Sequence, residues 1–187
     1  MNALPIILIV LAVLVVLFVI LTYNGLVKTR NRIDNARSQI DVQLKRRHEL
    51  IPNLVETVKG YAAHERATFE AVIAARTHAM DAASSGSLPA QAEAENALSG
   101  TLKSLFALAE AYPDLKANTN FLALQEELTS TEDRIAYSRQ FFNDAVLGFN
   151  TRIQTFPATV IARSFGFTPR EYFTADPGDQ APVTVKF

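Results

Sequence analysis

Histidines are the first candidates for chemistry in this sequence, because imidazole is the commonest metal ligand in proteins. His48, His64 and His78 lie 16 and 14 residues apart, whereas two zinc ligands on one helix need a spacing of three or four residues. His64-Glu65 begins a string similar to the HExxH motif of metalloproteases, but Thr68 stands where the second histidine is required. We therefore predict no metal site.

Paired carboxylates are the second candidates, since glutamates inside a helical bundle can hold two iron ions. Glu126-Glu127 and Glu132-Asp133 are such pairs, but the sequence lacks the Glu-x-x-His motif that completes a di-iron site. It also lacks a glycine-rich phosphate loop and a G-x-S-x-G motif. We predict a protein that is not an enzyme, with no catalytic residue, no cofactor and no known small-molecule substrate.

Polar residues are nevertheless frequent on segments that otherwise show the periodicity of packed helices. One interpretation is that several of them form buried hydrogen-bonded pairs that fix the register of the helices. The alternative is that they line a groove, which would favour a ligand-binding sensor or an enzyme with a polar site inside the bundle. The residues concerned are Asn31, Asp34, Gln39, Asp41, Gln43, Asn53, Glu132, Arg134, Arg139, Asn143 and Asn150.

The elements that must position these residues are helices throughout, because apolar residues recur at helical spacing along the chain. Pro52 predicts a turn, and the segment Ser84–Pro89 predicts another. The expected helices are about 24–48, 52–83, 89–111 and 119–156. The sequence thus predicts an all-α fold in which residues 23–165 form one antiparallel, up-and-down four-helix bundle.

The last of these helices carries the most regular pattern. Its apolar residues follow one another at intervals of seven, a repeat that gives a packing seam of the coiled-coil type. We expect this whole face to lie in the core. Its members are Phe121, Leu128, Ile135, Phe142, Phe149 and Phe156.

The first apolar stretch, Ala3 to Leu21, contains 19 residues and no charge. About 20 apolar residues cross the ~30 Å hydrocarbon core of a bilayer as a helix. A cleaved signal peptide would have a basic start and a small-residue cleavage site, yet Met1-Asn2 is uncharged and Leu21-Thr22-Tyr23-Asn24 is no such site. We therefore predict a retained single-pass transmembrane anchor over residues 1–22, continuing as a helix into the bundle.

The charges beside this stretch predict its orientation. Lys28, Arg30, Arg32 and Arg37 follow it, no basic side chain precedes it, and basic flanks stay in the cytoplasm. We expect a short N-terminus outside the bacterial inner membrane and a cytoplasmic body, with the lipid bilayer as a first partner.

The overall charge of −1 argues against nucleic acid as a partner, because that affinity comes from neutralising phosphates. The charge is unevenly placed: residues 23–47 carry seven basic and two acidic side chains, and residues 48–187 carry eleven and seventeen. This asymmetry fits a basic segment near a membrane and an acidic body. The absence of cysteine removes disulfides and thiolate metal sites.

Residues 166–187 are expected to form a flexible C-terminal tail after a short helix at 158–165. Pro, Gly, Asp and Gln dominate residues 174–182, a composition typical of a linker. Val183, Val185 and Phe187 then alternate with polar residues in the manner of a short strand. We predict that this end docks on a neighbouring copy or on another protein, and the alternative is that it folds back on its own bundle or stays free.

Several blocks of the sequence resemble the bacterial LemA family. They run from Ile40 to Val55 (IDVQLKRRHELIPNLV), then Val58–Tyr61 and His64-Glu65, and continue with Tyr112–Ala117, Phe141–Val146, Asn150 and Phe165-Gly166-Phe167. Arg37 and Phe142 depart from it, standing where Trp and Tyr are expected. The resemblance implies a membrane-anchored helical bundle without established catalytic activity, and relatives associated with magnetosome membranes imply a membrane-organising role. We therefore expect a scaffold that forms homo-oligomers or binds other membrane proteins.

Overall fold

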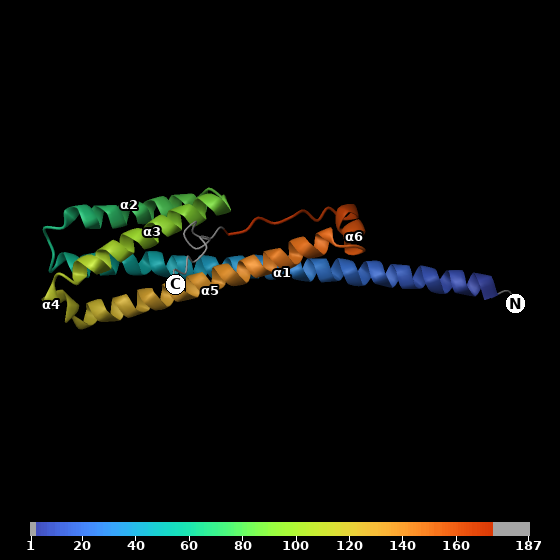
Figure 1. The fold of residues 1–187 in the computed structure, drawn as a ribbon, viewed down its shortest axis with the longest axis horizontal. Coiled ribbons are helices and arrows are strands. Elements are labelled where there is room, and N and C mark those ends of the chain that lie inside the picture. Colours follow the sequence, from blue (N-terminus) through green and yellow to red (C-terminus); the bar gives the residue numbers. More distant parts are fainter. Residues whose placement is uncertain (1–2, 174–187) are drawn as a thin grey trace, which may run out of the picture. The chain divides into compact units, whose positions relative to one another are not determined.

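The computed structural model describes residues 3–173, which are mainly helical and, within this range, contain no strand. The helices are α1 (Ala3–Lys59), α2 (Arg66–Ser84), α3 (Leu88–Ala109), α4 (Pro113–Lys116), α5 (Thr119–Gln154) and α6 (Ala158–Ser164), as Figure 1 shows. The prediction of an all-α fold with an apolar N-terminal helix is confirmed.

The chain divides into two compact units, whereas the sequence predicted one domain after the anchor. Within the described range, unit 1 comprises residues 3–38 and 140–171, and unit 2 comprises residues 39–139 and 172–173. Helices α1 and α5 each contribute to both units. A long helix can do this because its backbone hydrogen bonds are satisfied within the helix itself, wherever its side chains are packed.

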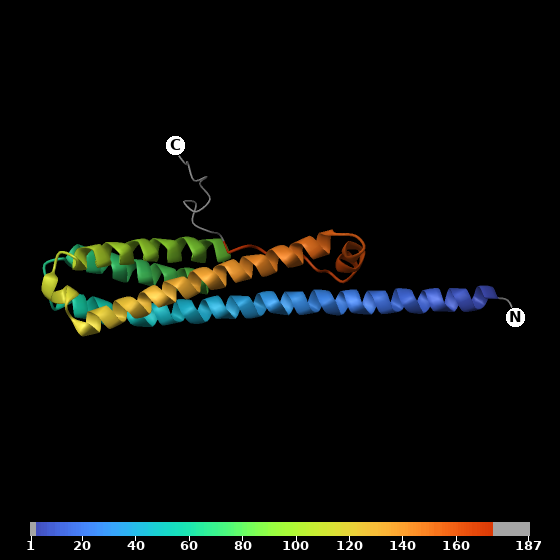
Figure 2. The same ribbon diagram turned by 60° about the horizontal axis from the view of Figure 1, so that its bottom comes forward.

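One hydrophobic core holds unit 2 together, and its residues come from α1 to α5. Helices α2 and α3 lie side by side in both Figure 1 and Figure 2. The turn between them has Gly86 at a φ of +77°, a conformation that glycine adopts without strain. Ser87 then caps α3 by accepting a hydrogen bond from the Ala90 amide at 3.4 Å.

The predicted turn at Pro52 is wrong, because α1 continues through this proline as far as Lys59. The last part of α1 places Ile51, Leu54 and Val58 in the core of unit 2, each at most 1% exposed. The turn comes instead at residues 60–65, so the helix expected at 52–83 begins only at Arg66.

A hydrogen bond from another helix explains why Pro52 is tolerated. Proline has no amide hydrogen, so the carbonyl four residues earlier, that of His48, loses its normal donor. Arg76 of α2 replaces this donor, since its Nε–H donates to the His48 carbonyl oxygen at 2.8 Å. The cost of a proline inside a helix is therefore offset by a tertiary contact that the sequence pattern does not reveal.

The seven-residue repeat of α5 lies in the core, with one exception. Five of its six members are at most 3% exposed, but Phe156 is 82% exposed. Helix α5 ends at Gln154, so Phe156 lies beyond the last turn and no longer faces the seam. Helices α3 and α5 otherwise begin and end within two residues of the expected bounds.

The start of the expected flexible tail is held in place. Asn150 of α5 donates through Nδ2 to the Arg170 carbonyl at 2.9 Å and accepts from the Arg170 amide at 2.8 Å. In unit 2, Phe173 is fully buried and lies under the Arg139 guanidinium, 4.8 Å from its ring centroid. The strand-like segment at 182–187 lies outside the described residues.

The support that Arg76 gives to Pro52 can be tested by a double-mutant cycle. We expect Arg76→Leu to lower the free energy of unfolding by about 1–3 kcal/mol, because the partly buried His48 carbonyl loses its donor. In a Pro52→Ala background the new amide at position 52 can bond this carbonyl, so the same change should cost less. Urea unfolding of the four proteins measures this coupling, and an equal cost in both backgrounds would contradict the explanation.

Candidate functional site

A buried network of charged side chains lies in the core of unit 2. Arg47 of α1 is 1% exposed and Glu95 of α3 is 2% exposed. Glu132 of α5 joins them with a partly exposed carboxylate, and His48 of α1 is 8% exposed. Four side chains from three helices therefore meet at one place.

Arg47 is the centre of this network. Its Nη1 donates to Glu132 Oε1 at 2.5 Å and to Ser99 Oγ at 2.8 Å. Its Nη2 forms an ion pair with Glu95 Oε2. The guanidinium thus binds two carboxylates through different nitrogens, a geometry that lysine could not reproduce.

The second carboxylate oxygen of Glu95 faces His48, whose Nε2 lies 3.0 Å from Oε1. Burial by itself raises the pKa of the Glu95 carboxyl. The hydrogen bond with His48 and the positive charge of Arg47 outweigh this effect, so the pKa lies below its ordinary value of 4.5. Glu95 is therefore a carboxylate at neutral pH, and its charge is balanced within the core.

Most polar groups of the network bind one another, whereas Arg47 Nε and His48 Nδ1 are buried and have no hydrogen-bond partner among the described residues. Ser99 lies 3.2 Å from Glu132 Oε2 and accepts from Arg47, while His48 faces Glu95. Ser99 and His48 thus each bind a carboxylate and not each other, so this network does not form the serine–histidine pair that activates a nucleophile. The arrangement links α1, α3 and α5 at fixed positions, which is the established use of polar groups between helices.

Sequence reasoning named His48 and Glu132 but missed Arg47 and Glu95. The signal was present, since Arg47 continues the seven-residue repeat of Leu26, Ile33 and Ile40. A charged residue on a buried stripe needs a buried partner of opposite charge. Glu95 likewise extends the apolar stripe of α3 towards its start.

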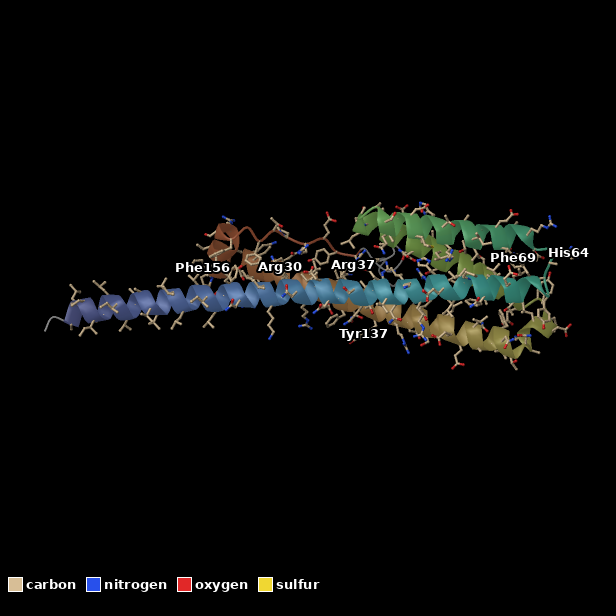
Figure 3. All side chains as sticks on the ribbon, turned by 180° about the vertical axis from the view of Figure 1, so that it is seen from behind. Arg30, Arg37, His64, Phe69, Tyr137 and Phe156 are labelled. Atoms are coloured by element: carbon tan, nitrogen blue, oxygen red, sulfur yellow. The ribbon has the colours of Figure 1, made fainter. Side chains whose placement is uncertain are left out.

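The other candidates of the sequence analysis lie apart from this network. His64, in the turn before α2, and His78, on α2, are exposed. Figure 3 marks the positions of His64 and of Phe69, which is buried in the core. Residues 3–173 contain no group of three or more His, Asp or Glu side chains that could hold a metal ion.

At least three of the eleven polar residues named in the sequence analysis form internal pairs. Glu132 and Asn150 form the hydrogen bonds given above, and Arg139 Nη1 donates to Asn96 Oδ1 at 2.9 Å. The hydrogen bonds of these three residues support the interpretation of internal pairing, although their partners are not among the polar residues that the sequence analysis named. Six others are exposed: Asn31, Asp34, Gln39, Asp41, Asn53 and Arg134.

A cluster of aromatic rings in unit 1 forms a second candidate site. The Tyr23 ring of α1 lies 4.9 Å from that of Phe165 and 5.8 Å from that of Phe167, measured between centroids. Phe167 also lies 6.3 Å from Phe149 of α5 and carries Arg30 over its face at 5.8 Å. These contacts hold α6 and the segment after it against the two long helices. We call Tyr23, Phe149, Phe165 and Phe167 the aromatic cluster.

Comparison with known proteins supports the resemblance. A model described as LemA family matches residues 36–187. Magnetosome protein MamQ 2 of Paramagnetospirillum magneticum is 25% identical over 205 residues, covering 97% of this chain and 75% of that protein. Magnetosome protein MamQ of Magnetospirillum gryphiswaldense is 25% identical over 187 residues, covering 88% and 69% respectively. Protein LemA of Metamycoplasma hominis is 28% identical over 141 residues, covering 75% and 63%.

The network makes a prediction about stability in acid. The pKa of Glu95 is lower in the folded chain than in the unfolded chain. The ionised Glu95 carboxylate therefore stabilises the fold fully above pH 4.5, and this stabilisation is lost as the pH falls through the folded pKa. We expect Glu95→Gln to lower the free energy of unfolding by about 3–5 kcal/mol near neutral pH, because Arg47 loses a buried counter-ion. The loss of stability below pH 4.5 should also become shallower.

Glu127→Gln is the matched control, since Glu127 pairs with Arg46 at the surface, where both side chains are more than a third exposed. Such pairs contribute about 0–1 kcal/mol. Urea unfolding of the full chain in detergent across pH 3 to 7 gives both readouts. Equal effects of the two substitutions would mean that the buried network does not stabilise the fold.

Proposed function

The chain belongs to the LemA family, and on this premise we propose that it is a non-catalytic interaction protein. In this proposal it is a scaffold, anchored by one span in the bacterial inner membrane, that associates with copies of itself or with other membrane proteins. Relatives named as magnetosome proteins support extending to this chain the membrane-organising role that the family implies.

One observation carries the proposal: α1 joins a stretch able to cross a membrane to the helical core without a break. A window of 18 residues in α1 has a mean hydropathy of 3.6, and none of it is buried. The same helix places Arg47 and Leu54 inside unit 2. An apolar helix left uncovered in this way favours lipid as its surroundings.

The arrangement of the polar groups supports a scaffold over a sensor or an enzyme. A ligand site needs a concave pocket with polar groups directed into it. The groups of the Arg47 network are directed towards one another instead, at 2.5 to 3.2 Å. Two surface hollows are each lined by one helix, residues 24–35 of α1 and residues 122–133 of α5.

We further propose that α2, α3 and the parts of α1 and α5 in unit 2 form an up-and-down four-helix bundle, shorter than the predicted bundle of residues 23–165, and that it lies in the cytoplasm. Lys28, Arg30 and Arg32 follow the apolar stretch directly. Each contributes about 1 kcal/mol when it lies near the anionic lipid of the cytoplasmic leaflet. These charges support a body that stays on that side.

Cysteine cross-linking in cells tests both the self-association and the side of the membrane, because the chain has no cysteine of its own. Val42, Ile73 and Tyr137 lie on three helices of unit 2 and are 61%, 46% and 71% exposed. Replacing each in turn by Cys, we expect a membrane-permeant bismaleimide to give cross-linked species from at least one variant. A membrane-impermeant bismaleimide should give none until the cells are lysed.

Ala79→Cys is the control for chemical access, since Ala79 lies on α2 with Ile73 but is fully buried. It should remain unlinked under both reagents. Cross-linking of the exposed positions by the impermeant reagent in intact spheroplasts would overturn the orientation. If none of the three positions gives a product of any mass, the scaffold proposal is wrong.

A further inference from the structure

Unit 1 has an apolar edge that no described residue covers. Phe156 precedes α6 and is 82% exposed, Val160 lies on α6 and is 57% exposed, and Phe165 ends it at 55%. Figure 3 shows Phe156 at the end of α5, projecting beside α1. Three large apolar side chains left exposed before, on and directly after one short helix are typical of an interaction site. We call Phe156, Val160 and Phe165 the α6 edge.

Contacts within unit 1 place this edge level with the end of the apolar stretch. Phe165 packs on Tyr23, two residues after Leu21, the last residue of the stretch. Thr22 is buried, and Val19 is partly covered although all other described residues before Thr22 are exposed. Residues 3–21 rise about 28 Å as a helix, close to the thickness of the hydrocarbon core. With a membrane span over residues 3–21, as proposed above, the boundary of the bilayer falls at the α6 edge.

The charges around the edge suit the same surroundings. This part of unit 1 consists of residues 19–33 and 147–167. The first range contains three Lys or Arg residues and the second contains two, and neither contains Asp or Glu. The Arg152 guanidinium lies against Gly25, where an added Cβ would come within 3.0 Å of its central carbon. Lys28 and Arg32 line one hollow together with asparagines of α1. Apolar side chains surrounded by positive charge are typical of segments that lie in a membrane interface.

We propose that the α6 edge inserts into the interfacial layer of the same bilayer that α1 crosses. The protein then has a second contact with lipid, in which aromatic and aliphatic side chains enter the boundary between headgroups and acyl chains while the neighbouring basic groups meet phosphate. Tyr23 corresponds to the aromatic belt of membrane proteins, in which Tyr and Trp lie at the level of the headgroups. This inference rests on the proposed membrane span, and it adds that unit 1 sits directly on the membrane surface and has a fixed rotation about α1.

The chain has no tryptophan, so one introduced tryptophan reports on a single position. In the full chain, reconstituted in nanodiscs of mixed neutral and anionic lipid, we expect Phe156→Trp and Val160→Trp to be quenched by lipids brominated close to the headgroup. The expected loss is about half of the fluorescence, since interfacial side chains lie roughly 5–10 Å inside the headgroup boundary. Tyr137→Trp, on an exposed residue of unit 2, should keep its fluorescence.

Phe18→Trp distinguishes failure of the inference from failure of the anchor, because Phe18 lies within the apolar stretch and is 44% exposed. Quenching at position 18 with none at positions 156 and 160 would overturn the inference and leave the membrane span intact. Quenching at none of them would overturn both. Equal quenching at positions 137 and 156 would mean general adsorption to lipid and would also overturn the inference.

Discussion

The continuity of α1 is the constraint on which the rest of the structure depends. This single helix of 57 residues contains the apolar stretch, the basic segment after it and, towards its end, residues that pack in the core of unit 2. Its two weak points are Gly25 and Pro52, and an arginine from another helix supports each. Arg152 packs on the bare backbone at Gly25, and Arg76 donates to the carbonyl that Pro52 leaves without a partner.

The two units use different physics at their contacts with this helix. In unit 2 the buried Arg47 meets carboxylates from α3 and α5, and such a network fixes register because any shift leaves a charge without its partner. In unit 1 the contact is aromatic, through Tyr23 and Phe167, and the surrounding surface is basic and apolar. The charged network of unit 2 specifies how helices pair. The basic and apolar surface of unit 1 suits the contact with lipid that we propose.

Much of the fold could be predicted from the sequence, because apolar periodicity and breakers act locally. The repeat in α5 and the turn at Gly86 are examples. The continuation of α1 through Pro52 could not be predicted, because it depends on a hydrogen bond from Arg76, which lies 24 residues further along the chain. Arg47 was also missed, because its partners come from distant helices, although its place on a buried stripe was a sign. Phe156 fitted the repeat yet lies beyond the end of its helix.

The central claim is that the apolar stretch and the segment after it form one continuous helix when the protein is reconstituted in a membrane. The most direct test is the distance between two spin labels, measured by double electron–electron resonance. The labels are attached to cysteines that replace Leu11 and Asn35, two exposed residues of unit 1 on either side of Gly25. Across 24 residues a continuous helix predicts about 36 Å. A narrow distribution near this value is the expected result, and a broad or much shorter one would contradict the account.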